Sequence, residues 1–211
     1  MLLRKLRTLF LVMAFACIAA SCSTVNQSQP PRTATEQLLI SRAADHAAER
    51  LAVKLPPKTA VFLDTSDFEG FDQKYAIGTL KDRLLKSGVR LVDKGKADVV
   101  VEIRSGALSI NKSENLIGIP SVPIPIPLTG APLTTPEIAL FKDEKQQGVA
   151  KFAMTAYGAK DGALRASSGP VYGFSHRTKW VVLLFISWTT QDILPEDQEP
   201  SDDLVPEKPS L

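Results

Sequence analysis

The sequence predicts an α/β fold of the α+β kind, with two helices and a mixed sheet. Apolar residues recur at helical spacing in two stretches, 33–55 and 72–87, and short runs rich in β-branched residues follow each of them. The second half of the chain instead alternates strand-like runs with polar turns. We therefore expect a first helix, then strand, helix, strand and strand, and finally an antiparallel hairpin meander.

Residues 1–21 predict a bacterial lipoprotein signal peptide. Three of the first seven residues are basic, and residues 9–20 form an apolar stretch too short to span a bilayer as a mature helix. The tetrapeptide Ala-Ala-Ser-Cys that ends at Cys22 resembles a lipobox, which makes Cys22 the acylated first residue of the mature protein. Cys17 is a poorer competing site, and ordinary cleavage or an uncleaved anchor are the alternatives.

Cleavage before Cys22 leaves 190 residues (211 minus 21), which suits one domain with extensions. We expect a flexible tether at 22–32, a single domain at 33–190, and a disordered, acidic, proline-rich tail at 191–211. From residue 192 the tail has seven carboxylates and one lysine, hence −6, so residues 22–191 carry +5. Their basic residues are scattered and form no stripe with aromatic residues, so nucleic acid is not an expected partner.

The first helix is predicted to begin at Thr33. Thr33 and Glu36 form a capping-box pattern, in which the threonine oxygen accepts from a first-turn amide and the glutamate reaches back. Alanines dominate the apolar stripe that follows, so we expect close packing against a sheet or another helix. Pro56 and Pro57 end the helical pattern.

The next elements are short and regular. Residues 59–64, 89–92 and 97–103 are apolar runs that predict strands, with a turn at 93–96. Residues 72–87 predict the second helix, and Gly88 supplies the residue that turns left-handed at its C-terminal end.

Prolines interrupt the pattern between residues 111 and 136. Alternating prolines cannot form a central strand, because each lacks an amide donor, so we expect an extended, polyproline-like segment. This segment is apolar for a loop, since it contains Ile119, Val122, Ile124 and Ile126. Two interpretations stay open: it lies against its own domain, or it presents these side chains to a partner or a bilayer.

The antiparallel half is predicted from two turn signals. Strands at 138–141 and 149–157 flank the polar stretch 142–148, as in a hairpin. The pair Asp161-Gly162 favours positive backbone angles and leads to a strand at 163–168.

Residues 180–188 are apolar on both faces and are bounded by Trp180 and Trp188. The first interpretation is a central strand covered on both sides. The second is a membrane-contacting strand with an aromatic residue at each interface, which requires oligomerisation because a single strand leaves its edges open.

The residues able to carry catalysis or metal binding are few. His46 is expected on a solvated helix face, and His176 lies near several serines, but no Gly-x-Ser-x-Gly motif frames a nucleophile. No metal-binding spacing is present, and we expect neither a metal nor a cofactor. An acidic loop follows the first strand, where open sheets often bind ligands, and Arg104 is a candidate ion-pair partner for it; its acidic residues are Asp64, Asp67, Glu69 and Asp72.

Three stretches resemble the signature segments of an uncharacterised family of bacterial lipoproteins: PRTATEQLL at 31–39, GIPS at 118–121 and GVAK at 148–151. This resemblance implies no known activity. A broader topological likeness is to the periplasmic domain of the curli secretion channel lipoprotein and to the N-terminal domain of the translocation protein TolB. It implies an envelope α/β domain with a role in secretion or assembly.

These observations predict a non-enzymatic lipoprotein that Cys22 anchors in the outer membrane, facing the periplasm, with a structural, assembly or interaction role. In the resemblance, Ser23 favours the outer membrane, because an aspartate there would favour retention in the inner membrane. Expected partners are the membrane and an envelope protein or a second copy. The alternatives are a carrier or sensor of a small apolar or lipid ligand, bound between the sheet and residues 118–127, and a hydrolase. The candidate interaction surface is Ile119, Val122, Ile124, Ile126, Trp180 and Trp188.

Overall fold

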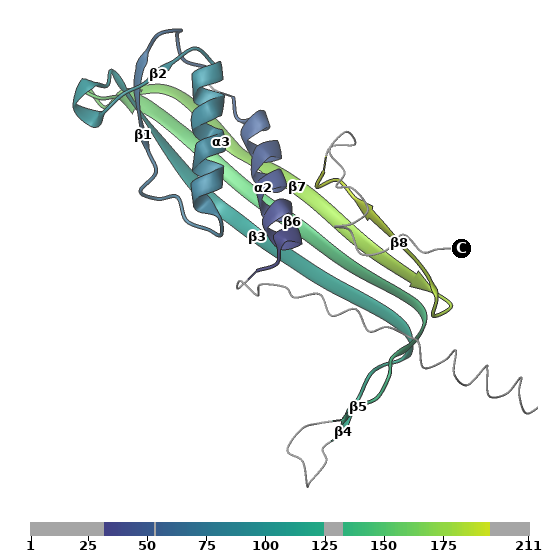
Figure 1. Cartoon of the computed structure of the whole chain (residues 1–211). Helices are drawn as coiled ribbons and strands as arrows, with labels where there is room; N and C mark the ends of the chain where they lie inside the picture. Colours follow the sequence, from purple (N-terminus) through teal and green to yellow (C-terminus); the bar gives the residue numbers. More distant parts are fainter. Residues whose placement is uncertain (1–31, 53, 125–132, 195–211) are drawn as a thin grey trace, which may run out of the picture. The chain divides into compact units, whose positions relative to one another are not determined.

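The computed structural model describes residues 32–52, 54–124 and 133–194, and they have the predicted fold class (Figure 1). The chain divides into two compact units, Met1–Arg32 and Thr33–Leu211, and every described helix and strand belongs to the second. The elements are the helices α2 (Ala34–Arg50) and α3 (Gln73–Lys86), the 3-10 turn η1 (Lys94–Lys96), and the strands β1 (Ala60–Asp64), β2 (Arg90–Leu91), β3 (Val99–Ile119), β4 (Pro123–Ile124), β5 (Leu133–Thr134), β6 (Ile138–Gly158), β7 (Leu164–Val182) and β8 (Ile186–Gln191).

Six of these strands form one mixed sheet in the order β2-β1-β3-β6-β7-β8. β1 pairs in parallel with β2 and β3, whereas β3, β6, β7 and β8 pair antiparallel to one another. Both helices lie over the same face of the sheet, and β3, β6 and β7 continue well beyond them (Figure 1). The predicted order of strand, helix, strand and strand before an antiparallel meander is confirmed.

The predicted start of α2 is also confirmed. The Thr33 hydroxyl accepts from the Glu36 amide at 3.2 Å, and the Glu36 carboxylate accepts from the Thr33 amide at 2.9 Å. Glu36 also forms an ion pair with Lys112 of β3. The hydrogen bonds from Lys112 and Thr33 lower the pKa of Glu36, so the capping carboxylate stays charged at neutral pH.

α2 lies very close to the sheet because small residues meet at this contact. A Cβ atom at Gly148 would lie 2.3 Å from the Leu39 carbonyl oxygen, and one at Gly173 would lie 1.9 Å from the Ala43 carbonyl oxygen. The buried Ser175 hydroxyl donates to the Leu39 carbonyl at 2.6 Å. The alanine-rich face of α2 therefore meets glycines of β6 and β7 almost backbone to backbone, as the small side chains predict.

Side chains of α2 also cover the edge of β7. His46 donates through Nδ1 to the Phe174 carbonyl at 2.7 Å, and Arg50 donates to the Tyr172 carbonyl. These carbonyls belong to the part of β7 that has no β8 partner, since the β8 ladder ends at Arg177. His46 therefore protects a strand edge and does not merely occupy a solvated helix face.

The hydrophobic core lies between the two helices and the part of the sheet that they cover. α3 buries Ala76, Leu80 and Leu84 in it, and the Phe152 ring of β6 packs 5.2 Å from the Phe68 ring. Gly88 has φ +89° just after α3, which confirms its predicted left-handed role.

β3 and β6 are much longer than predicted. The polar stretch 142–148 was expected to be a turn, but it lies inside β6 and pairs with β3 on one side and β7 on the other. Residues 111–119, assigned to the proline-rich segment, likewise belong to β3, which ends directly before Pro120. These predictions were wrong because cross-strand neighbours on both sides satisfy the backbone, so a strand tolerates polar residues on both faces there.

The turn between β6 and β7 and the C-terminal end of the fold were also predicted from the sequence. Gly162 has φ +66° and Asp161 accepts from the Ala163 amide at 3.0 Å, so the predicted Asp-Gly turn is confirmed. The described fold extends past residue 190, because β8 includes Gln191 and Ile193 is buried. Residues 195–211, most of the predicted tail, lie outside the described residues.

Two glycines of β7 provide a matched test of the close contact with α2. We expect Gly173→Ala to lower the free energy of unfolding by about 3 kcal/mol, because the new methyl group meets the backbone of α2. Gly169→Ala is the control, since a Cβ atom at Gly169 meets nothing within 4 Å. Urea denaturation followed by circular dichroism measures both, and equal stabilities would contradict the contact.

Candidate functional site

The candidate surface residues fall into two groups. Ile119 at the end of β3, Val122 beside β4 and Ile124 in β4 are all exposed. β4 and β5 form a separate two-stranded sheet. Ile126 lies outside the described residues, as does Cys22. Trp180 and Trp188 lie on β7 and β8, where their rings stack with centroids 6.1 Å apart.

Residues 180–188 form a hairpin and not a central strand. β7 ends at Val182, residues 183–185 make the turn, and β8 begins at Ile186. Phe185 is 76% exposed and Leu184 is 55% exposed. The interpretation of a strand buried on both faces was therefore wrong, because the run folds back on itself and pairs Trp180 with Trp188.

The hairpin completes an apolar row across the end of the sheet. In this row, Ile117, Phe141, Val182 and Ile186 are direct neighbours on β3, β6, β7 and β8. Side chains of direct neighbours on adjacent strands point to the same face of the sheet. Gly148 lies in a row that contacts α2, and Phe141 is an odd number of residues from Gly148 along β6. Because successive side chains of a strand alternate between faces, the apolar row points away from α2. The row and the turn together form what we call the apolar end, which comprises Ile117, Phe141, Val182, Leu183, Leu184, Phe185 and Ile186.

A row of mixed polarity lies directly behind the apolar end on the same face. It contains Asn115, Asp143, Trp180 and Trp188 on the four strands. Asp143 is buried, accepts from the Asn115 amide at 3.0 and 3.1 Å, and lies 3.2 Å from the Lys145 ammonium group. The same ammonium group lies 5.7 Å from the Trp180 ring centroid, so the tryptophans border a satisfied polar cluster.

The other face of this part of the sheet is charged. Lys142 of β6 lies 2.9 Å from Glu114, 3.0 Å from Glu137 and 3.1 Å from Glu144. These hydrogen bonds, that of Glu114 first, outweigh partial burial and raise the pKa of Lys142 above its usual value. The strands beyond the helices therefore have two different faces: the helix side carries the charged cluster around Lys142, and the other face combines aromatic residues with the Asp143–Lys145 ion pair.

The turn of the hairpin has an unfavourable backbone. Leu183 has φ +51° and Leu184 has φ +73°, a region where glycine, asparagine and aspartate are the usual residues. Both amides are satisfied, since Leu183 donates to the Leu140 carbonyl at 2.9 Å and Leu184 to the Ala139 carbonyl at 3.0 Å. Two exposed leucines thus occupy positions where they cost stability, which points to a use for their side chains outside the fold.

The two histidines and their neighbours take structural positions. Ser175 points toward α2, whereas its neighbour His176 points to the opposite face. His176 Nδ1 lies 3.0 Å from an Asp192 carboxylate oxygen, and that carboxylate also accepts from the His176 amide at 2.7 Å. This pair fastens the chain after β8 to β7, and Ser175 is not within its reach as a nucleophile.

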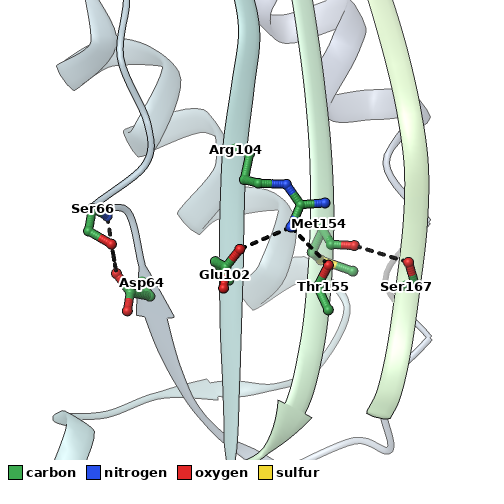
Figure 2. A network of polar contacts seen from close by, with 7 residues as sticks. All are labelled: Asp64, Ser66, Glu102, Arg104, Met154, Thr155 and Ser167. Carbon is green, nitrogen blue, oxygen red and sulfur yellow. Dashed lines mark hydrogen bonds and ion pairs between the residues drawn. The ribbon is translucent and has the colours of Figure 1, made fainter.

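The acidic loop after β1 is held by local hydrogen bonds (Figure 2). Asp64 accepts from the Ser66 hydroxyl and amide, which lowers the pKa of Asp64. Arg104 does not pair with this loop, because it donates to Glu102 at 2.9 Å and to Thr155 at 3.1 Å. Among the described residues, no group of three or more potential ligands is arranged to hold a metal ion.

A cavity of about 710 Å³ lies between the N-terminal turns of α2 and α3. Leu38 and Tyr75 give it apolar walls, and Ser41 and Lys74 add polar groups. The predicted ligand site was elsewhere, between the sheet and residues 118–127. Neither described helix is long and apolar enough to cross a membrane.

Sequence reasoning missed most of the apolar end. Trp180 and Trp188 were recognised, but Ile117 and Phe141 were assigned to other elements, and residues 183–185 were assigned to a strand. The turn contains no glycine, proline, asparagine or aspartate, so no local signal marks it. The one signal of a hairpin was that Trp180 and Trp188 lie at equal distances from the middle of the apolar run 180–188.

Strain in this turn gives a testable prediction. We expect the double substitution Leu183→Asn, Leu184→Gly to raise the free energy of unfolding by about 1–2 kcal/mol, because both new residues favour positive φ. Chemical denaturation of the double variant beside the native chain measures the change. A loss of stability of similar size would show that the leucine side chains contribute to packing in the fold.

Comparison with known proteins gives a family and no function. No curated protein matches the chain. The uncharacterised family expected from residues 31–39, 118–121 and 148–151 agrees with the finding from family models. The model of a family of unknown function, DUF6655, matches residues 17–183, and because this is most of the chain, the protein belongs to that family.

Proposed function

We propose that this protein is a non-enzymatic lipoprotein, anchored by Cys22 in the outer membrane and facing the periplasm, that acts through contacts with other envelope components. The observation that carries the proposal is the apolar end. Its Phe185 and Ile117 side chains are 76% and 63% exposed, and no element among the described residues covers them. Large exposed apolar side chains grouped at one place are typical of an interaction surface.

The stability that the fold loses at the turn supports a role for the apolar end. Leucines at two positive φ angles lower the stability of the fold, and an asparagine and a glycine would serve the turn better. The leucines fit a protein whose apolar end meets an apolar partner.

The positions of the reactive side chains support a role without catalysis. Ser175 is buried against α2, and the exposed pair of His176 and Asp192 joins β7 to the segment after β8. His46 protects the edge of β7. Each of these groups therefore has a structural contact that accounts for it.

The anchor is tested by two serine substitutions. Cys22→Ser should abolish labelling with a palmitate analogue and release the protein from membranes, or leave its precursor unprocessed, because the thiol that receives the lipid is gone. Cys17→Ser is the matched control and should keep the label. Persistent label in the Cys22→Ser protein would refute the anchor.

The surface is tested by a charge at the turn. Leu184→Asp should leave the fold intact and reduce self-association at high concentration, because Leu184 is exposed and aspartate tolerates its positive φ. Leu164→Asp, at the opposite end of β7 and also exposed, is the control and should leave self-association unchanged. Circular dichroism and gel filtration measure both, and an unfolded Leu184→Asp protein would mean that this residue belongs to a core.

A second candidate function is a carrier or sensor of a small apolar or lipid ligand. The cavity between α2 and α3 favours it, since a volume of about 710 Å³ suits a small molecule. Native mass spectrometry of protein purified from envelopes is the test. A bound small molecule that is lost on Leu38→Trp, a substitution that narrows the cavity, would favour the carrier over the interaction role.

A further inference from the structure

We infer that the apolar end inserts into the surface of the same membrane that holds the lipid anchor, so that the domain contacts the bilayer at a second point. This inference rests on the proposed function, because it requires the anchor at Cys22. It names the bilayer as the partner of the apolar end.

The polarity of the sheet changes in steps along the face opposite α2. The apolar end contains the outermost row that all four strands share, Ile117, Phe141, Val182 and Ile186, and beyond it only β3 and β6 continue, to Ile119 and Ile138. The next row contains the stacked Trp180 and Trp188 together with Asn115 and the buried Asp143. Behind it, Ser113, Lys145, Thr178 and Thr190 form a polar row. This order, apolar, then tryptophan, then polar, matches the change from acyl chains to headgroups to water.

The tip of the hairpin suits an apolar medium. In the turn, Leu183 and Leu184 present apolar side chains while their amides donate to carbonyls of β6. An amide without a partner is costly in hydrocarbon, so the hydrogen bonds of these two amides lower the cost of inserting the tip. Phe185, the most exposed large apolar side chain among the described residues, lies in the same turn.

The same physics limits the depth of insertion. Among the described strands, β8 pairs with β7 alone and forms the edge of the sheet, so no described strand pairs with its outer backbone groups. The helix side of the strands also carries Lys142 and its three glutamates. Open backbone and charge cannot enter hydrocarbon cheaply, so only the apolar end enters and the tryptophans remain at the interface.

The tether is long enough for this arrangement. Residues 23–32 are ten residues, which reach ~35 Å when extended. The domain begins at Thr33, and the nearby Glu36 pairs with Lys112 of β3. From Lys112 to Ile119, at the end of β3, is seven residues, or ~23 Å. The anchor and the apolar end can therefore reach one membrane together.

The chain contains two tryptophans, and both are at this site, so their fluorescence reports on it directly. The experiment uses the full chain in vesicles of phosphatidylethanolamine and phosphatidylglycerol, with or without phosphatidylcholine brominated near the headgroup end of its acyl chains. We expect bromine to quench the tryptophans of the native chain and of Leu164→Asp, the matched control. The quenching should be lost in Phe185→Asp and in Leu184→Gly, whose new residue suits the turn.

Each other outcome overturns the inference in a distinct way. Unquenched tryptophans in a chain that stays on the vesicles would refute the membrane contact and leave the anchor intact. Tryptophans shielded from aqueous iodide but not quenched by bromine would identify a second copy or another protein as the partner. Equal quenching in Phe185→Asp and the native chain would show that the apolar end does not make the contact. A native chain that does not stay bound to the vesicles would refute the lipid anchor itself.

Discussion

The contact between α2 and the glycines of β6 and β7 determines the rest of the structure. Gly148 and Gly173 let the helix backbone reach the sheet, and the Ser175 hydroxyl fixes its position on Leu39. The contact also determines how much of the sheet the helices cover. A helix of 17 residues is ~26 Å long, whereas a strand of 21 residues is ~70 Å long. α2 therefore cannot cover the whole of β3 and β6, and α3 lies over the same end of the sheet (Figure 1).

The uncovered part of the sheet must be stabilised by its own side chains. No helix in the described part of the chain covers it, so cross-strand pairs on each face provide its stability. On the helix side, these pairs are charged and centre on Lys142. On the other face, the stacked Trp180 and Trp188 and the tilted Phe141 ring form a small aromatic cluster. The apolar end is the extension of that cluster beyond the last polar row.

Local signals in the sequence predicted the part of the fold that depends on local chemistry. The capping box at Thr33, the left-handed Gly88 and the turn at Asp161-Gly162 each follow from a residue whose side chain or flexibility suits one backbone conformation. The fold class followed from the spacing of apolar residues. These predictions did not depend on which strands are neighbours.

The parts that failed depend on pairing across the sheet. Taken by itself, the polar stretch 142–148 predicts a loop. It is a strand because β3 pairs with it on one side and β7 on the other. Residues 183–185 read as a strand because they are apolar, and they are a turn because β8 returns along β7. The apolar end unites residues from four strands, so no single stretch of sequence could have identified it.

The central claim is that β3, β6 and β7 continue as a paired sheet beyond the helices and carry the apolar end. Hydrogen exchange of the full chain in detergent, read by mass spectrometry, tests it most directly at residues 142–147. The structure predicts that these amides exchange slowly, because β6 has hydrogen-bonded neighbours on both sides there. Exchange as fast as in an open loop would contradict the claim. It would show that residues 142–147 form the turn that their polar sequence predicts.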